Sequence, residues 1–67
     1  MMAVGQTVRM YREQAGMTQL ELAERLGTKQ SSISRLERDQ YLPSLSFLLE
    51  VCKALNLQLE VKISKQD

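Results

Sequence analysis

The chain has 67 residues, of which 43% are hydrophobic, and its 9 basic and 8 acidic side chains leave a net charge of only +1. A chain of this length has room for one small domain with a marginal core, and with no His and a single Cys it can build neither an internal disulfide nor a zinc site. The absence of His also removes the usual proton-shuttling base, so we expect no enzymatic activity, no metal and no cofactor.

The distribution of apolar and charged residues bears on location and partners. No apolar run is long enough to cross a bilayer, and no basic stretch followed by an apolar run opens the chain. Together with the free Cys52, these features predict a cytoplasmic protein without a membrane partner. Residues 1–38 carry a charge of +2 and residues 39–67 a charge of −1, so the basic side chains point to the first half of the chain.

Apolar residues at helical spacing predict four helices, over residues 4–15, 19–26, 30–38 and 45–55. The second helix has the clearest boundaries, because Thr18 and Glu21 form a capping-box pattern at its start and Gly27 is a left-handed stop at its end. Gly16 and Asn56 mark the ends of the first and the fourth helix in the same way. All four helices are expected in a single domain over residues 1–63, with residues 64–67 as a short tail.

Two further features concern the third and fourth helices. Lys29 is a poor N-cap, so the start of the third helix is the least well-marked boundary, whereas Ser44 is a good N-cap for the fourth. The apolar face predicted for the fourth helix consists of Leu45, Leu48, Leu49, Cys52 and Leu55. On that face, Cys52 is interpreted as a reduced core thiol, with a redox sensor as the alternative.

Beyond the fourth helix the hydrophobic period changes from helical to alternating, which predicts a half-buried strand over residues 57–63. Its apolar residues are Leu57, Leu59, Val61 and Ile63. Because the chain offers no second strand, these residues would leave their backbone groups unpaired unless the same strand of a second copy joins them about a twofold axis. We therefore predict a homodimer held by an intermolecular two-stranded ribbon. The alternative is an extended tail whose apolar side lies on the fourth helix.

The second and third helices, joined by a tight turn at Gly27, form a helix-turn-helix pattern. The third helix is about as long as the major groove of DNA is wide, about 12 Å. Its outward residues are Gln30, Ser31, Ser34, Arg35 and Arg38. Amide and guanidinium groups can form paired hydrogen bonds with adenine and guanine edges. An ordinary solvated helix face has a similar composition, so the pattern alone leaves DNA binding open.

The run from Thr18 to Glu37 resembles the Cro/CI-type (XRE) helix-turn-helix family, and the similarity extends over roughly residues 5–56. The positions that match the family pattern are Gln19, Ala23, Gly27, Ile33, Leu36 and Glu37. The resemblance implies a mainly α fold of the four- to five-helix type, here with four helices and one C-terminal β-strand that pairs across a homodimer. Lys29 departs from the usual Ser or Thr cap, which leaves the entry of the third helix open.

The same resemblance implies roles for individual residues. Base contacts are expected from Lys29, Gln30, Ser31, Ser34 and Arg35, and phosphate contacts from Gln19, Arg38, Gln40 and Tyr41. Backbone amides of the loop over residues 39–42 are expected to contact phosphates too, although the Tyr41 side chain could instead pack against Pro43. The resemblance also implies a structural ion pair between Arg12 and Glu37, the alternative being two separate surface charges.

The predicted strand and the segment over residues 29–34 resemble HipB- and HigA-like antitoxins. This similarity implies a homodimeric repressor that binds a palindromic double-stranded DNA operator, represses its own operon and can neutralise a cognate toxin protein. A controller of a restriction–modification operon and a small phage or plasmid repressor are alternatives. A third alternative, from another functional class, is a protein-interaction module that inhibits a partner protein without binding DNA.

Overall fold

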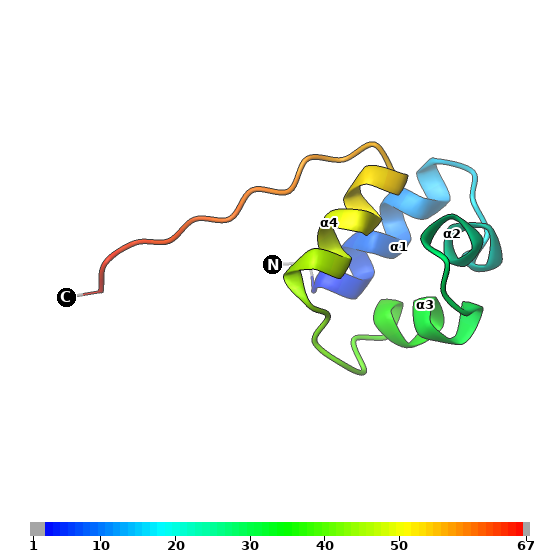
Figure 1. Cartoon of the computed structure of the whole chain (residues 1–67), viewed down its shortest axis with the longest axis horizontal. Coiled ribbons are helices and arrows are strands. Elements are labelled where there is room, and N and C mark those ends of the chain that lie inside the picture. The colour runs from blue at the N-terminus through cyan, green and yellow to red at the C-terminus, as the bar shows by residue number, and fades with distance from the viewer. Residues whose placement is uncertain (1–2, 67) are drawn as a thin grey trace.

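The computed structural model describes residues 3–66, which form four helices followed by an extended segment (Figure 1). The helices are α1 (Val4–Gln14), α2 (Gln19–Leu26), α3 (Gln30–Glu37) and α4 (Leu45–Ala54). The mainly α fold with four helices is thus the one predicted. Met1 and Met2, which the predicted domain includes, and Asp67 of the predicted tail lie outside the described residues.

The starts of α2 and α4 are fixed by side chains close by in the sequence. Thr18 Oγ1 accepts a hydrogen bond from the Glu21 N–H at 3.0 Å, and Glu21 Oε1 accepts one from the Thr18 N–H at 3.0 Å, which confirms the capping box. Ser44 Oγ likewise accepts from the Phe47 N–H at 3.1 Å. Lys29 precedes α3 without any side-chain cap.

All four helices end in the same way, with one residue in the left-handed region after the last turn: Gly16, Gly27, Asp39 and Asn56. After α2, for example, the Gly27 N–H donates to the Glu24 carbonyl at 3.2 Å and the Thr28 N–H to the Ala23 carbonyl at 2.9 Å, which is the Schellman arrangement. The predicted bounds of α2 are confirmed. The other three helices end one residue earlier than predicted, because the residue before the left-handed one already has ψ between −2° and 7°.

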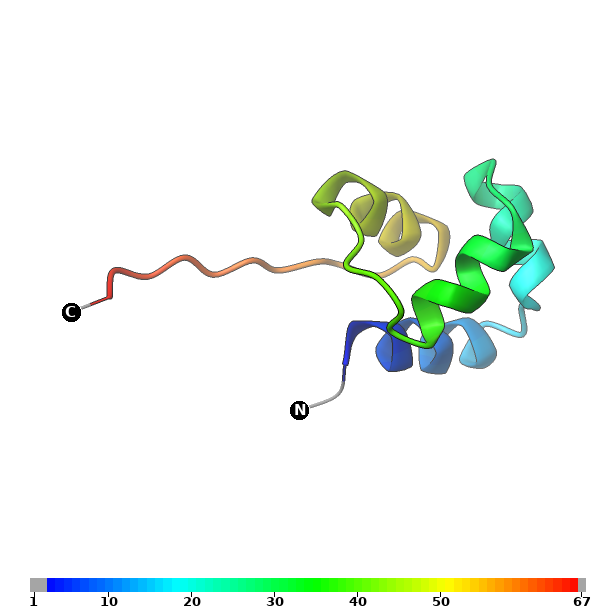
Figure 2. The same cartoon turned by 90° about the horizontal axis from the view of Figure 1, so that it is seen from below.

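The hydrophobic core lies where α2 and α3 meet each other and where α1 and α4 cover them. It consists of Val8, Leu22, Ala23, Ile33, Leu36, Val51 and Leu55. Figure 2 shows α1 along the lower edge of the helical body, with α3 and α4 above it. Ala23 is fully buried, and its small side chain allows α2 to lie close to α3. The core thus holds α3 by one side only.

The apolar face predicted for α4 is only partly the face that the fold buries. Val51, absent from that face, is 1% exposed, and Leu55 is buried as predicted. Leu45 and Leu49 instead remain 54% and 43% exposed, and Cys52 is a half-buried free thiol. The apolar surface of α4 is wider than a single stripe, and only the stripe that faces the core can be covered within the chain.

The strand predicted over residues 57–63 is not formed within residues 3–66, where this segment is extended and leaves the helical body (Figure 1). The molecule is therefore 44 Å long but only 23 and 22 Å across. A strand is defined by its ladder of hydrogen bonds, and no neighbouring strand within the described residues supplies one. Leu57 and Leu59 are half-buried and border an apolar groove of about 180 Å³ between α1 and α4. Val61 and Ile63 are 60% and 94% exposed.

A long-range contact joins the end of α3 to the start of α1. Ala3 offers no capping side chain to α1, but Asp39 Oδ1 accepts a hydrogen bond from the Gly5 N–H at 2.8 Å. A Cβ atom at Gly5 would collide with the Leu36 carbonyl oxygen. Asp39 therefore occupies a left-handed position that usually favours Gly, because its carboxylate caps a helix from across the fold.

Candidate nucleic-acid interface

The outward face of α3 is polar and accessible. Lys29, Gln30, Ser31, Arg35 and Arg38 are exposed, and Ser34 is half-buried. The opposite side of α3 is held by Ile33 and Leu36, which are 0% and 1% exposed. The structure therefore brings the predicted base-contacting residues onto one surface of a helix that the core fixes in place.

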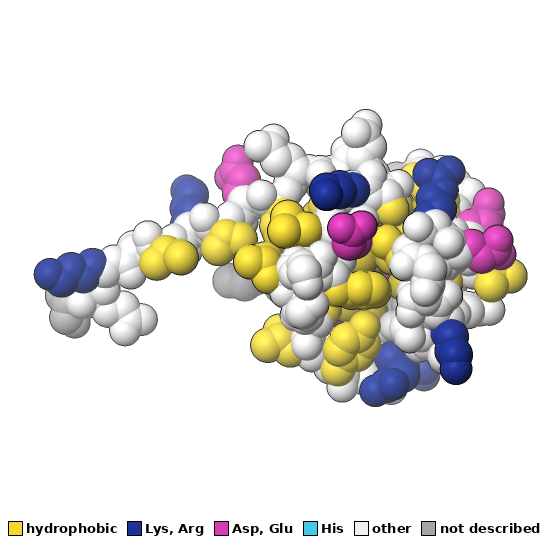
Figure 3. Space-filling view, viewed as in Figure 1, with side chains coloured by type: hydrophobic (Ala, Val, Ile, Leu, Met, Phe, Trp, Pro, Cys, Tyr) yellow, Lys and Arg dark blue, Asp and Glu magenta, His cyan; other side chains and the backbone are white. Residues whose placement is uncertain are grey.

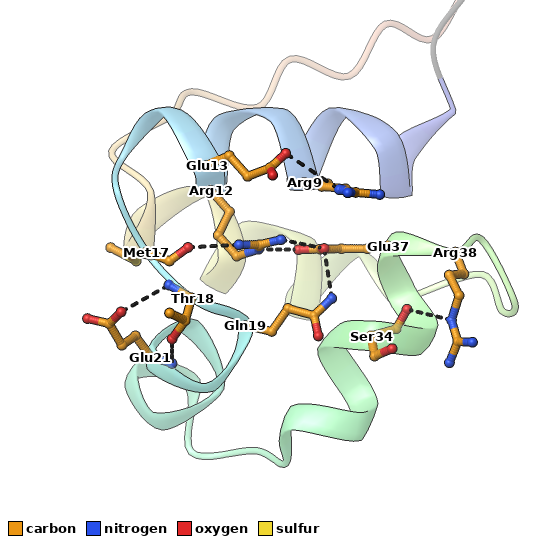
Figure 4. Close-up of polar contacts among 10 residues, drawn as sticks. All are labelled: Arg9, Arg12, Glu13, Met17, Thr18, Gln19, Glu21, Ser34, Glu37 and Arg38. Carbon is orange, nitrogen blue, oxygen red and sulfur yellow. Dashed lines mark hydrogen bonds and ion pairs between the residues drawn. The ribbon is translucent and has the colours of Figure 1, made fainter.

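At the C-terminal half of α3, two arginines have partners within the chain. The Arg38 Nε donates to the Ser34 carbonyl oxygen at 3.4 Å (Figure 4). The guanidinium carbon of Arg35 lies 5.5 Å from the centroid of the Tyr41 ring. A residue predicted to contact a base and one predicted to contact a phosphate are thus stacked on each other.

The loop that follows α3 differs from the prediction in one respect. The N–H groups of Asp39 and Gln40 donate to the carbonyls of Leu36 and Arg35, at 3.0 and 3.1 Å. Both amides thus already have acceptors within the chain, whereas the prediction assigned them to phosphates. The Gln40 side chain remains exposed, and Tyr41 is half-buried.

A buried ionic network lies directly behind this surface (Figure 4). Arg12 and Glu37 form a two-pronged ion pair, in which Nε donates to Oε2 at 2.6 Å and Nη2 donates to Oε1 at 2.9 Å. Both residues are almost fully buried, at 8% and 5% exposure. Arg12 Nη1 also donates to the Met17 carbonyl oxygen at 2.7 Å, so the guanidinium joins α1, α3 and the turn before α2.

Gln19, predicted to contact a phosphate, extends this network toward the surface. Its side-chain nitrogen donates to Glu37 Oε1 at 3.1 Å, and the residue is half-buried at the start of α2. The sequence pattern did not reveal this hydrogen bond, because the two residues lie 18 positions apart. The first turn of α2 is thereby tied to the last turn of α3, which orients the two helices relative to each other.

The surroundings of Glu37 determine its ionisation. Burial on its own raises the pKa of a carboxyl group, but the hydrogen bonds from Arg12 and Gln19 outweigh it and hold the pKa of Glu37 below its usual range. The hydrogen bond with Glu37 in turn raises the pKa of Arg12. Both groups are charged in the folded protein at neutral pH, and the folded state therefore favours an ionised Glu37.

We expect the network to make the fold sensitive to acid. Because the pKa of Glu37 is lowered by folding, its contribution to the free energy of unfolding is complete above the unfolded-state pKa of about 4.3 and is lost as the pH falls through the lower, folded-state value. Urea denaturation at a series of pH values from neutral downward measures this. Glu37→Gln should flatten the acid limb, and an unchanged limb would contradict the assignment.

Two further observations concern membranes and metal ions. None of the helices within residues 3–66 is long and apolar enough to span a membrane. The described part of the chain also contains no cluster of three or more His, Cys, Asp or Glu that could hold a metal ion.

Comparison with known proteins places this geometry in a family. A family model described as helix-turn-helix matches residues 8–62, which include all of α2, α3 and α4. The chain belongs to the helix-turn-helix family. Within it, α2 and α3 are the helices on either side of the turn at Gly27, and α3 is the second helix of the pair.

Several helix-turn-helix proteins are similar to this chain. The immunity repressor of Bacillus phage phi105 is 37% identical over 65 residues, which make up 97% of this chain and 45% of that repressor. The structure of SinR, the master regulator for biofilm formation, in complex with DNA has a TM-score of 0.78 and 35% identity over 84% of this chain and 90% of the SinR chain in that structure. HipB in its O2 20mer complex has a TM-score of 0.75 and 29% identity over 92% of this chain and 86% of the HipB chain in that structure.

This helix-turn-helix chain spans about half the length of two of its curated relatives. It spans 45% of the length of the phage repressor and 59% of that of SinR from Bacillus licheniformis. The matched region carries the helix-turn-helix unit, and the similarity does not extend to the rest of those proteins.

Proposed function

We propose that this chain is a sequence-specific DNA-binding transcriptional repressor that places α3 in the major groove and acts without catalysis. The observation that carries the proposal is the row of exposed hydrogen-bonding side chains on a helix whose other side is fully buried. A rigid helix can present such groups to base edges at little cost in ordering. The likeness to SinR, whose structure contains DNA, supports it.

The proposed contacts divide into two groups. Those that read sequence come from Lys29, Gln30, Ser31, Ser34 and Arg35, and those that hold the phosphate backbone come from Gln19, Arg38, Gln40 and Tyr41. The Gln30 amide suits adenine and the Arg35 guanidinium suits guanine, because each offers two matched hydrogen bonds. Phosphate contacts set position without reading sequence, and they make binding weaker as salt rises.

The test is a selection of DNA sequences by the whole chain from a random pool, followed by affinity measurements on the selected site and on a random duplex. The proposal requires one enriched sequence and a steep fall in affinity as salt is raised. Recovery of no preferred sequence would overturn it. Binding of equal strength to selected and random duplexes would also overturn it.

Two substitutions, one on α3 and one directly after it, distinguish contacts that read the base sequence from contacts that hold the phosphate backbone. Gln30→Ala should weaken binding to the selected site by about 1–3 kcal/mol and relax the preference at one base pair. Arg38→Ala should weaken binding to selected and random duplexes about equally and lower the salt dependence. Fluorescence anisotropy on both duplexes measures the two effects. Equal losses for both variants on both duplexes would refute the role of Gln30.

We further propose that the chain acts as a homodimer on a palindromic operator, with the two copies of α3 about 34 Å apart in successive major grooves. The support is apolar surface left uncovered within the chain. Leu45, Leu49, Val61 and Ile63 are all at least 43% exposed. Figure 3 shows hydrophobic side chains that continue from the tail onto the helical body. Such a continuous patch marks an interaction surface.

The order of residues in the tail favours one register of an antiparallel pair. With Val61 at the twofold axis, Leu59 lies opposite Ile63 of the partner subunit, and Glu60 lies opposite Lys62 of the partner subunit. The smallest shift that keeps apolar residues opposite apolar ones, which is two residues in either direction, places either two copies of Glu60 or two copies of Lys62 face to face. Opposite charges across a strand pair stabilise it and like charges destabilise it. The proposed ribbon therefore has Val61 at its centre.

The proposal includes autoregulation of an antitoxin type. It is supported by the likeness to HipB, which covers 92% of this chain with 29% identity. The test is whether the sequence selected in vitro occurs upstream of the gene for this chain and whether the chain represses a reporter from that DNA. Absence of the site there would refute autoregulation and leave the DNA-binding proposal standing.

A further inference from the structure

The stack of Arg35 on Tyr41 joins two parts of the proposed interface that differ in burial. Arg35 is an exposed side chain on α3. Tyr41 is half-buried and packs against the hydrophobic core. The distance of 5.5 Å from the guanidinium carbon to the ring centroid lies within the range of a cation–π interaction, about 6 Å. The fixed partner is therefore the ring, and the long flexible side chain rests on it.

The backbone around Tyr41 is held on both sides. The Gln40 N–H, directly before Tyr41, donates to the carbonyl oxygen of Arg35 itself at 3.1 Å. Asp39 is tied to the start of α1 through the Gly5 N–H at 2.8 Å. The loop that carries the ring is thus anchored to α3 and to α1, and the position of the ring relative to Arg35 follows from these contacts.

We infer that Tyr41 is a positioning residue for Arg35, whose ring holds the guanidinium in the orientation that reads a base edge. This inference rests on the proposed DNA-binding function. A guanidinium forms two parallel hydrogen bonds with guanine only when its plane is aligned with the edge of the base. A stacked guanidinium has lost much of its rotational freedom before DNA binds, so less is lost on binding. The ring performs this role, and the phenolic hydroxyl is not needed.

The experiment compares Tyr41→Phe, Tyr41→Leu and Arg35→Ala in the full chain. The probes are the duplex that the unaltered chain selects from a random pool and its single-base-pair variants. Arg35→Ala should lose about 5- to 150-fold of discrimination at one base pair. Tyr41→Leu should lose about two- to fivefold at that same base pair, and Tyr41→Phe should keep full discrimination. Tyr41→Leu combined with Arg35→Ala should lose no more discrimination than Arg35→Ala alone.

Tyr11 provides the matched control, because it is the second tyrosine of the chain and also packs half-buried against the core. Tyr11→Leu should change the free energy of unfolding. It should leave unchanged the difference in affinity between the selected duplex and its variants at the base pair that Arg35 reads. If Tyr41→Leu bound DNA more weakly but discriminated between base pairs as well as the unaltered chain does, the inference would be overturned. Tyr41 would then affect selectivity no more than the control residue Tyr11 does. Loss of discrimination in Tyr41→Phe as large as that in Tyr41→Leu would overturn it too, since the ring would then not be enough to position Arg35.

A measurement without DNA separates failure of this inference from failure of the proposed function. In the free chain, the ring current of Tyr41 should shift the side-chain proton resonances of Arg35 upfield. The shift should persist in Tyr41→Phe and disappear in Tyr41→Leu, with circular dichroism to confirm that both variants are folded. Absence of the shift in the unaltered chain would overturn the inference on its own. A chain that shows the shift but selects no DNA sequence would overturn the proposed function.

Discussion

Replacement of Glu37 by Ala is expected to lower the free energy of unfolding by about 3–5 kcal/mol, which is close to the whole stability of a domain of this size. The substitution leaves the Arg12 guanidinium buried at 8% exposure without its counter-charge, and it removes the acceptor of the Gln19 amide. An unpaired buried charge is far more costly than the loss of a surface pair. Urea denaturation monitored by far-UV circular dichroism measures the change, and a largely unfolded variant agrees with it.

The other ion pair of α1 is a matched control. Arg9 Nε and Glu13 Oε1 lie 3.5 Å apart, and the two side chains are 63% and 57% exposed. Arg9→Ala should therefore lower the free energy of unfolding by no more than about 1 kcal/mol. Removal of both buried charges, by Arg12→Met with Glu37→Leu, should cost less than either single change, because no charge is left unpaired. If Glu37→Ala were as mild as Arg9→Ala, the network would not stabilise the fold.

Val61→Lys is expected to convert the proposed dimer to a monomer and to weaken operator binding by about 10²- to 10⁴-fold. In the proposed register, the substitution brings two ammonium groups together at the twofold axis in place of an apolar contact. Two linked half-sites gain affinity in this range over one, and a monomer loses that gain. Light scattering over a dilution series gives the oligomeric state, and anisotropy on the selected duplex gives the affinity.

The neighbouring charges of the tail test the register. Glu60→Lys and Lys62→Glu should each weaken the dimer, because each places like charges opposite one another. The double variant Glu60→Lys with Lys62→Glu exchanges the signs and should restore it. If the unaltered chain is monomeric throughout the micromolar range, the ribbon is refuted. If the double variant forms a weaker dimer than both single variants do, only the proposed register is refuted.

Local signals in the sequence predicted much of the fold. The bounds of α2 follow from Thr18, Glu21 and Gly27, because a capping box and a left-handed stop act on backbone groups within one helical turn. The spacing of Ile33 and Leu36 likewise predicts which side of α3 is buried and hence which side chains face outward. The family resemblance added the partnership of Arg12 with Glu37, which local pattern cannot supply across 25 positions.

The features that could not be predicted from the sequence depend on contacts between residues that lie far apart in the chain. Nothing local shows that Asp39 takes a left-handed conformation, because the reason lies in the Gly5 amide, 34 positions away. The buried stripe of α4 also depended on how the other helices approach it. Val51 and Leu49 are both apolar, and only packing decides which of them faces the core.

The sequence by itself thus determined the number of helices, where each begins, the end of α2 and the polar face of α3, since each depends on a few neighbouring residues. The tertiary structure decided which polar groups around that face have partners within the chain. It assigned the amides of Asp39 and Gln40 to the end of α3, the Gln19 amide to Glu37, and the Tyr41 ring to Arg35. The physical reason is that a side chain or backbone amide can interact with a distant residue only when the packed helices bring the two into contact.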